Sequence, residues 1–180
     1  MTIEFVEGNI FESPAQTIVN TVNCKGVMGK GLALRFKKMY PEMYKEYKEY
    51  CKQGKLRIGI LLPPYQASEH RWILNFPTKD HWRFKSKLEY IEAGLTYFGE
   101  KYREWGITSI AFPRLGCQLG GLSWKEVKPL MIRHLENLPA LKVSVHSYTP
   151  QSRTKQKTKK PKKEKLGTLK QPTSQQQLRP

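Results

Sequence analysis

Two glycine-rich segments have the residue types and spacing that best fit the binding of an anion. The first reads NTVNCKGVMGKG over 20–31, and the second reads PRLGCQLGG over 113–121. Each lies between a strand-like run and a helix-like pattern. Glycine lets backbone N–H groups approach an anion closely, and the N-terminus of the following helix attracts negative charge. Two such loops on one sheet predict a cradle for a diphosphate, as in a nucleotide derivative.

The elements that must position these loops follow from the hydrophobic periodicity. Short apolar or alternating runs predict strands over 3–7, 17–22, 58–62, 72–76, 107–112 and 142–148. Apolar residues at helical spacing predict helices over 32–40, 43–54, 88–106 and 123–135. The last of these helices starts at Ser123 and Glu126, which are spaced as a capping box.

This order of elements, β-β-α-α-β-β-α-β-α-β, predicts an α/β fold with a mixed central sheet and helices on both faces. Both glycine loops and the segment 75–79 follow the carboxyl ends of predicted strands. Ligands of such sheets bind outside those strand ends. We therefore expect the three segments to meet at one edge of the sheet.

The charge of the chain is concentrated at its C-terminus. The 180 residues carry a formal net charge of +17, and 151–180 hold ten of the 32 Lys and Arg side chains but one of the 15 Asp and Glu. This stretch has too few apolar residues to offset the entropy of ordering it. We expect one domain at 1–149 and a disordered, lysine-rich tail at 150–180. Its charge suits nucleic acid, bound through phosphates; a solubilising terminus without a partner is the alternative.

The remaining composition restricts the setting of the protein. Three cysteines without CxxC spacing indicate a reducing compartment, and we interpret Cys24 and Cys117 as small packing residues rather than reactive thiols. We expect no bound metal, no signal peptide and no membrane span. A monomer in the cytoplasm is expected, although 159–163 would also serve as a nuclear import signal in a eukaryote.

Several motifs together resemble the macrodomain family, the ADP-ribose-binding α/β/α modules, over about residues 1–149. They are the segments 8–10, 19–23, 29–31 and 115–121. Within that family the chain looks most like the DarG-type antitoxin macrodomains, which remove ADP-ribose from thymidine bases of DNA. Segments 75–83 and 116–121 carry this closer likeness. The terminal ADP-ribose protein glycohydrolase, which acts on glutamate esters, is the next most similar; Gly120 stands where it has a catalytic aspartate.

The resemblance implies an ADP-ribosyl glycohydrolase acting on a modified macromolecule. Thymidine-linked ADP-ribose on single-stranded DNA is the expected substrate, with ADP-ribosylated protein as the other possibility. ADP-ribose is then a ligand and product, and no cofactor is expected. Two further functions stay open, a non-catalytic reader of ADP-ribose and a phosphatase acting on ADP-ribose 1″-phosphate.

The resemblance also implies a set of site residues. Lys79 is the expected catalytic residue, and Asn23 is expected to orient the distal ribose. The expected ADP-ribose contacts are Gly8, Asn9, Ile10, Asn20, Val27, Met28, Gly29, Lys30, Gly31, Thr78, Leu115, Gly116, Cys117, Gln118, Leu119, Gly120, Gly121 and Tyr148. His81, Trp82 and Arg83 are expected to contact nucleic acid, because an aromatic ring beside an arginine suits an unstacked base and its phosphate. Packing at the domain edge is the alternative for Trp82.

Lys79 has two possible chemical roles. After losing its proton it can attack an anomeric carbon, or the opened aldehyde, and form a Schiff base. Desolvation or a neighbouring cation would lower its pKa for that purpose. A charged Lys79 would instead stabilise the departing base. Without the family resemblance, a solvated surface lysine would be the simpler interpretation.

Overall fold

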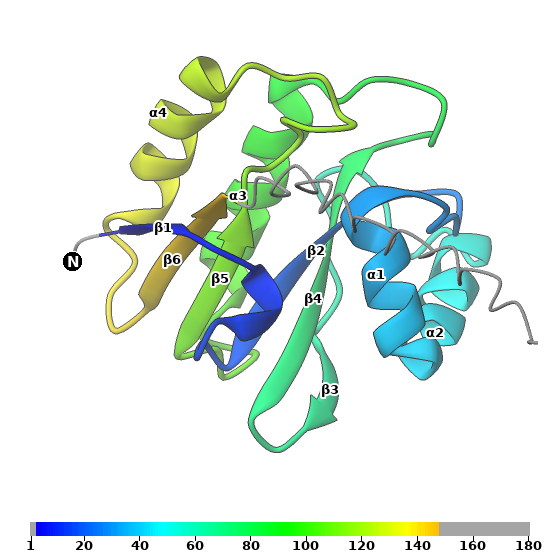
Figure 1. Ribbon diagram of the computed structural model, residues 1–180, viewed down its shortest axis with the longest axis horizontal. Coiled ribbons are helices and arrows are strands. Elements are labelled where there is room, and N and C mark those ends of the chain that lie inside the picture. The colour runs from blue at the N-terminus through cyan, green and yellow to red at the C-terminus, as the bar shows by residue number, and fades with distance from the viewer. Residues whose placement is uncertain (1–2, 148–180) are drawn as a thin grey trace, which may run out of the picture. The chain divides into compact units, whose positions relative to one another are not determined.

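The computed structural model describes residues 3–147, which form six strands, four α-helices and one short 3-10 helix (Figure 1). The strands are β1 (Glu4–Glu7), β2 (Thr17–Asn23), β3 (Tyr65–Ser68), β4 (Arg71–Lys79), β5 (Ser109–Pro113) and β6 (Lys142–Ser147). The helices are α1 (Gly31–Met39), α2 (Pro41–Lys52), α3 (Leu88–Lys101) and α4 (Trp124–Leu135), and the 3-10 helix is Ile10–Glu12. The predicted tail lies outside the described residues.

The six strands form one mixed sheet in the order β1-β6-β5-β2-β4-β3. All neighbours are parallel except β3, which runs antiparallel to β4 at one edge. Because β2, β4 and β5 are parallel, their carboxyl ends meet at the same edge, and Figure 1 shows their arrowheads pointing the same way. The predicted meeting of three segments at that edge is therefore confirmed.

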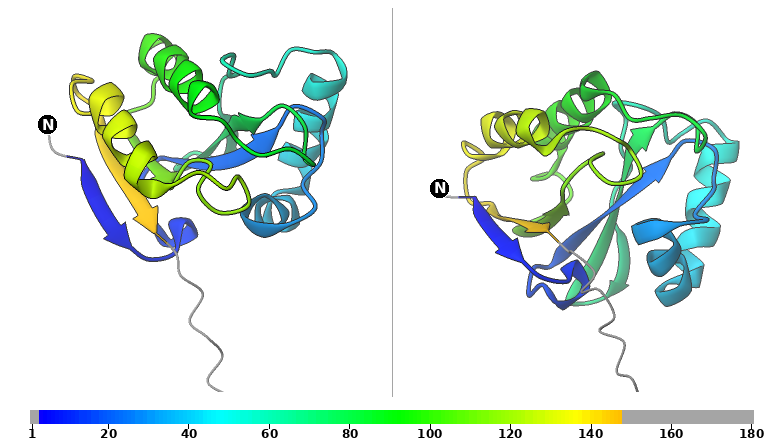
Figure 2. Two further views of the ribbon diagram at one scale, coloured as in Figure 1. Left: turned by 90° about the horizontal axis from the view of Figure 1, so that it is seen from above. Right: turned by 45° about the horizontal axis from the view of Figure 1, so that its top comes forward.

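Helices cover both faces of the sheet, as Figure 2 shows in the view from above. Alternate residues of each central strand feed two separate cores, since successive side chains of a strand point to opposite faces. On β2, Val19 packs in the core beneath α3 and α4, while Ile18 packs beneath α1 and α2. Both side chains are completely buried. The predicted three-layer α/β/α fold is confirmed.

Three local predictions are wrong. The apolar run 58–62 is a loop: Gly59 adopts a φ of 76°, and Arg57 and Ile60 form only an isolated bridge. The edge strand lies after the two prolines instead, at Tyr65–Ser68. β4 continues through Pro77, because β3 pairs only with its first residues and leaves an edge there that tolerates proline. Ser123 precedes α4, but its side chain makes no capping hydrogen bond.

Candidate functional site

Lys79 is the last residue of β4 and lies beside the end of β2. The strand register pairs it with Asn23, so the two expected catalytic residues are brought together. Its Nζ donates a hydrogen bond to the carbonyl oxygen of Leu119, 2.6 Å away in the second glycine loop. Partial burial lowers the pKa of Lys79 below the ordinary value for lysine. Lys79 is therefore a positioned, partly desolvated amine rather than a freely solvated surface side chain.

Asn23 organises the first glycine loop through its side-chain amide. Its Oδ1 accepts from the backbone N–H groups of Lys25 at 2.9 Å and Val27 at 3.4 Å, and its Nδ2 donates to the Val27 carbonyl at 2.6 Å. The Tyr47 hydroxyl donates to the Asn23 carbonyl at 2.7 Å. Asn23 thus shapes the loop from inside, and its contact with a ribose stays a prediction.

The two glycine loops touch each other. Gly31, the first residue of α1, has a φ of 59°, and a Cβ placed on it would lie 2.9 Å from a methyl carbon of Leu119. The positive φ favours glycine at position 31, and a side chain there would also displace the exposed Leu119 side chain. Neither α1 nor α4, the helices that follow the two loops, has a side-chain capping bond at its start. Their first N–H groups lack intrahelical partners, as a phosphate-binding helix terminus requires.

The second loop is packed too tightly for a side chain at position 120. A Cβ on Gly120 would lie 2.2 Å from the carbonyl oxygen of Gly116 and 2.4 Å from Oγ of Ser86. The Ser86 N–H donates to the Gly120 carbonyl at 2.9 Å, and Ser86 itself is buried. Sequence reasoning missed Ser86, which no local motif marks. An aspartate at position 120 is incompatible with this loop conformation.

The end of β1 contributes Asn9, whose side chain is engaged within the chain. Its Oδ1 accepts from the Phe11 N–H at 3.3 Å, and its Nδ2 donates to Glu12 Oε1 at 2.9 Å. Arg35 of α1 reaches the same Oδ1 at 3.4 Å and lies 4.7 Å from the centre of the Phe11 ring. Arg35 and Phe11 belong to this corner of the edge, although the sequence motifs did not include them.

The other expected contact residues divide by burial. Those of the two loops that reach the surface are Val27, Gly29, Lys30, Gly31, Gln118, Leu119 and Gly121. Asn20, Met28, Leu115, Ile10 and Thr78 are buried, and their contact with ADP-ribose stays a prediction. Gly8 and Cys117 are half-buried, and Gly8 donates its N–H to the Ser147 carbonyl at 3.1 Å. Tyr148 lies outside the described residues.

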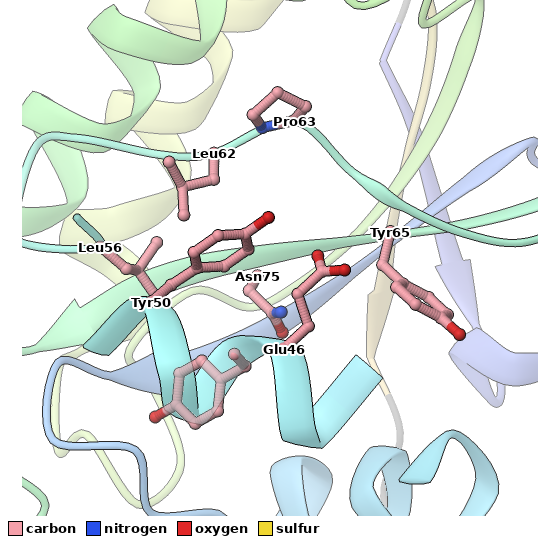
Figure 3. A pocket seen from close by; sticks show the side chains of 8 residues that line it. Glu46, Tyr50, Leu56, Leu62, Pro63, Tyr65 and Asn75 are labelled. Carbon is pink, nitrogen blue, oxygen red and sulfur yellow. The ribbon is translucent and has the colours of Figure 1, made fainter. Parts of the chain in front are cut away.

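Asn20 forms a polar pair in the middle of the sheet. Its Nδ2 donates to Oδ1 of Asn75, its direct neighbour on β4, at 2.9 Å. Asn75 also lines a pocket between α2, the segment before β3 and β4, shown in Figure 3 with Glu46 and Tyr50 at its wall. None of the lining residues belongs to the glycine loops, so this pocket is separate from the candidate site.

The segment between β4 and α3 exposes aromatic rings next to Lys79. Trp82 is 45% exposed and Phe84 is 65% exposed. The ring of His81 stacks on Trp82, with 5.3 Å between centroids, and the guanidinium of Arg83 lies 4.6 Å from the centre of the same ring. Nearly half of the Trp82 surface is thus open to a ligand, and the contact of this segment with nucleic acid stays a prediction.

The cysteines of the loops have the environment of packing residues. Burial raises the pKa of Cys24 to about 12 and that of Cys117 to about 11, so neither thiol readily forms the reactive thiolate. Within residues 3–147, no group of three or more His, Cys, Asp and Glu side chains is placed to hold a metal ion. No helix in that part of the chain is long and apolar enough to cross a membrane.

Comparison with known proteins identifies the fold family. Residues 19–131 match the Macro domain. The chain belongs to the macrodomain family. The DNA ADP-ribosyl glycohydrolase of Thermus aquaticus is 43% identical to this macrodomain over 146 residues, which are 80% of this chain and 41% of that protein. This macrodomain therefore spans about two fifths of the length of the curated relatives that it matches.

Two solved structures extend the likeness to three dimensions. The macrodomain of Mycobacterium tuberculosis DarG is 40% identical, with a TM-score of 0.78 over 82% of this chain and 99% of the other. Thermosipho africanus DarTG, solved in complex with ADP-ribose, is 41% identical, with a TM-score of 0.75 over 83% of this chain and 42% of the other. The resemblance to macrodomains of the DarG type is thus confirmed.

Proposed function

We propose that this macrodomain binds ADP-ribose at the edge formed by the two glycine loops and removes it from a modified macromolecule. Thymidine-linked ADP-ribose on single-stranded DNA is the proposed substrate. The placement of Lys79 supports this most strongly, because its amine sits between the two loops, 2.6 Å from the Leu119 carbonyl. The likeness to proteins named DNA ADP-ribosyl glycohydrolases supports the DNA substrate.

In this proposal the loops hold the diphosphate and the distal ribose. The exposed residues Gly29 to Gly31 of the first loop and Leu119 of the second supply backbone N–H donors, and the start of α1 adds a favourable dipole. The adenine lies toward Asn9 and Phe11, beyond the end of β1. The anomeric carbon then faces Lys79. ADP-ribose is the ligand and product, and the reaction uses no cofactor.

Lys79 acts in this scheme as the nucleophile. Its pKa is lowered by partial burial, so a larger fraction of the amine is unprotonated near neutral pH. The lone pair of Nζ attacks C1 as the bond from C1 to the thymine nitrogen breaks, and the departing thymine nitrogen takes up a proton. Opening of the ribose ring gives a Schiff base between C1 and Nζ. One water molecule hydrolyses this Schiff base to free ADP-ribose and restores the Lys79 amine.

The closed space at Gly120 supports a mechanism without a second-loop acid. Glutamate-ester cleavage that needs an aspartate there cannot use this loop, since even a Cβ would meet the Gly116 carbonyl at 2.2 Å. The N-glycosidic bond to thymidine is therefore the better fit. We also propose that the protein acts as a monomer in the cytoplasm.

Released ADP-ribose is the measurement that tests the function. Thymidine-ADP-ribosylated single-stranded DNA is incubated with wild type, Lys79→Ala, Lys79→Arg and the control Lys45→Ala, which removes an exposed lysine paired with Glu42 on α2. Wild type and the control are expected to release ADP-ribose, and both Lys79 variants to lose at least about 100-fold in rate. If Lys79→Arg released ADP-ribose at the wild-type rate, Lys79 would act only through its charge and not as a nucleophile.

Further measurements distinguish the hydrolase from a reader of ADP-ribose and from a phosphatase. Borohydride is expected to trap a covalent ADP-ribose adduct on wild type, with the added mass on Lys79. ADP-ribose binding by calorimetry without release by any variant would instead establish a reader. Release of phosphate from ADP-ribose 1″-phosphate, with modified DNA untouched, would establish the phosphatase.

A further inference from the structure

Most of the well-exposed large apolar side chains in residues 3–147 lie on the loops of the candidate site. Six large apolar residues in the described part of the chain are well exposed, and four of them lie on the three loops of the candidate site. These four are Val27 at 37%, Trp82 at 45%, Leu119 at 61% and Phe84 at 65%. A sugar diphosphate alone needs no such apolar rim, because its recognition is polar. The rim therefore points to a further, flat and apolar part of the substrate.

The rings next to Lys79 are held in a fixed arrangement by their own turn. The Arg83 N–H donates to Nδ1 of His81 at 3.1 Å, and the Phe84 N–H donates to the His81 carbonyl at 3.1 Å. The His81 ring lies between its neighbours, with centroids 5.3 Å from Trp82 and 5.2 Å from Phe84. These three rings form a preorganised aromatic platform, which we define as His81, Trp82 and Phe84.

Both ends of the platform segment are anchored to the ligand loops. At its start, the Cys24 N–H donates to the Asp80 carbonyl at 3.1 Å, and Lys25 pairs with the Asp80 carboxylate at 3.6 Å. At its end, the Ser86 N–H donates to the Gly120 carbonyl at 2.9 Å. The segment joins β4 to α3 and can be followed in Figure 1. The platform is thus fixed relative to both glycine loops.

We propose that the platform stacks an unpaired base next to the modified thymidine, while Arg83 neutralises the adjoining phosphate; this inference rests on the proposed function of the site. Every base has a π-face, so stacking on aromatic rings tolerates sequence, and a cation beside the rings suits the backbone. A flanking base in duplex DNA is already stacked and paired. The occupant is therefore single-stranded DNA with at least one nucleotide beyond the modified one.

Phe84 has a specific place in this proposal. Among residues 3–147 it is the most exposed of the large apolar side chains, and it follows directly after the three residues expected to contact nucleic acid. Apart from its contact with the His81 ring, most of this phenyl ring faces solvent. Against a base it would bury its free face, so we assign Phe84 a part in binding equal to that of Trp82.

The closing experiment measures binding without requiring hydrolysis. A fluorescently labelled single-stranded oligonucleotide with a central thymidine is titrated by anisotropy, and again with an abasic site beside the thymidine. Wild type is expected to lose about 5- to 100-fold in affinity at the abasic site, the equivalent of one stacked base. Trp82→Ala and Phe84→Ala are each expected to bind the intact oligonucleotide more weakly than wild type by a similar factor. On the abasic oligonucleotide these variants are expected to bind as tightly as wild type.

Phe5→Ala is the matched control, since Phe5 is also an exposed aromatic ring, 44% accessible, with the Lys128 amine 4.5 Å from its centre. It lies on the opposite edge strand β1 and is expected to leave binding unchanged. Equal binding of the intact oligonucleotide by wild type and both platform variants would overturn the platform. The platform would also be refuted if Trp82→Ala and Phe84→Ala lost as much affinity for the abasic oligonucleotide as for the intact one.

Hydrolysis of the modified oligonucleotide and of the modified mononucleotide then separates the two proposals. The platform variants are expected to lose kcat/KM on the oligonucleotide and to keep it on the mononucleotide. Absence of hydrolysis by wild type, with the abasic effect present, would refute the enzymatic function and retain the platform.

Discussion

Replacing Gly120 by alanine tests whether the second loop positions Lys79. The added methyl group would meet the Gly116 carbonyl oxygen at 2.2 Å and Ser86 Oγ at 2.4 Å. Regaining van der Waals separation requires a backbone shift of roughly 1 Å. Overpacking of this kind costs about 1–3 kcal/mol. For a domain of this size, the expected fall in Tm is about 2–12 °C.

The same shift is expected to affect the reaction more than the stability. The carbonyl that accepts from Lys79 belongs to Leu119, the residue directly before Gly120. Misplacing a reacting group by about 1 Å can lower a rate about 100-fold. Gly120→Ala is therefore expected to remain folded while it releases ADP-ribose from modified DNA about 100-fold more slowly. Thermal melts and the release assay are performed on the same preparation.

Two controls define what would refute this reasoning. Gly99→Ala adds a methyl group to α3 at an ordinary 3.5 Å from Leu138, so Tm is expected to be unchanged or higher and the rate unaffected. Adding Ser86→Gly to Gly120→Ala is expected not to restore the rate, because the clash with the Gly116 carbonyl remains. A Gly120→Ala protein with wild-type Tm and rate would show that close packing is not the reason for glycine there.

Three further predictions concern other parts of the molecule. Asn23→Ala removes three hydrogen bonds of the first loop, so we expect the free energy of unfolding to fall by about 1–3 kcal/mol. ADP-ribose is also expected to bind more weakly by calorimetry, and an unchanged affinity would contradict this. Burial lowers the pKa of His146 below its ordinary 6.5, so the unfolded chain binds the proton more tightly and stability falls as pH drops below about 6.5. His146→Gln is expected to make Tm depend less on pH between about pH 7.5 and 5.5, and the same dependence in wild type and variant would contradict this. Removing 151–180 deletes ten cations, so we expect a higher KM for DNA at moderate salt, an unchanged kcat and a KM that depends less on salt. The same salt dependence of KM with and without these residues would show that they have no role in binding.

Much of the fold could be predicted because its elements have strong local periodicity. The buried strands and the four amphipathic helices follow from apolar spacing, and the order of elements was correct. The position of β3 was not, since the apolar run 58–62 has the composition of a strand. Its backbone turns at Gly59, and the edge strand pairs instead with Arg71–Ile73. Pairing between segments decides such edges, and periodicity does not record it.

The candidate site could be predicted in outline but not in its contacts. Glycine spacing and strand ends brought the loops and Lys79 to one edge, because parallel strands place their carboxyl ends together. The bond from Lys79 to Leu119 joins residues 40 positions apart. Ser86 is likewise recognisable only from its packing against Gly116 and Gly120. Long-range contacts of this kind leave no signature in local sequence.

The buried pair Asn20 and Asn75 has a consequence for how the lysine is placed. A slip of one residue between β2 and β4 would send every side chain to the opposite face of the sheet. It would also separate the two amides, which meet at 2.9 Å only in the native alignment, and leave them unpaired among apolar neighbours. The pair thereby specifies the register between β2 and β4 at this position. That alignment extends to Val22 and Pro77, and a one-residue register shift directly after them brings Asn23 opposite Lys79. The catalytic edge therefore combines a register set by a buried amide pair with a local irregularity at the end of β2.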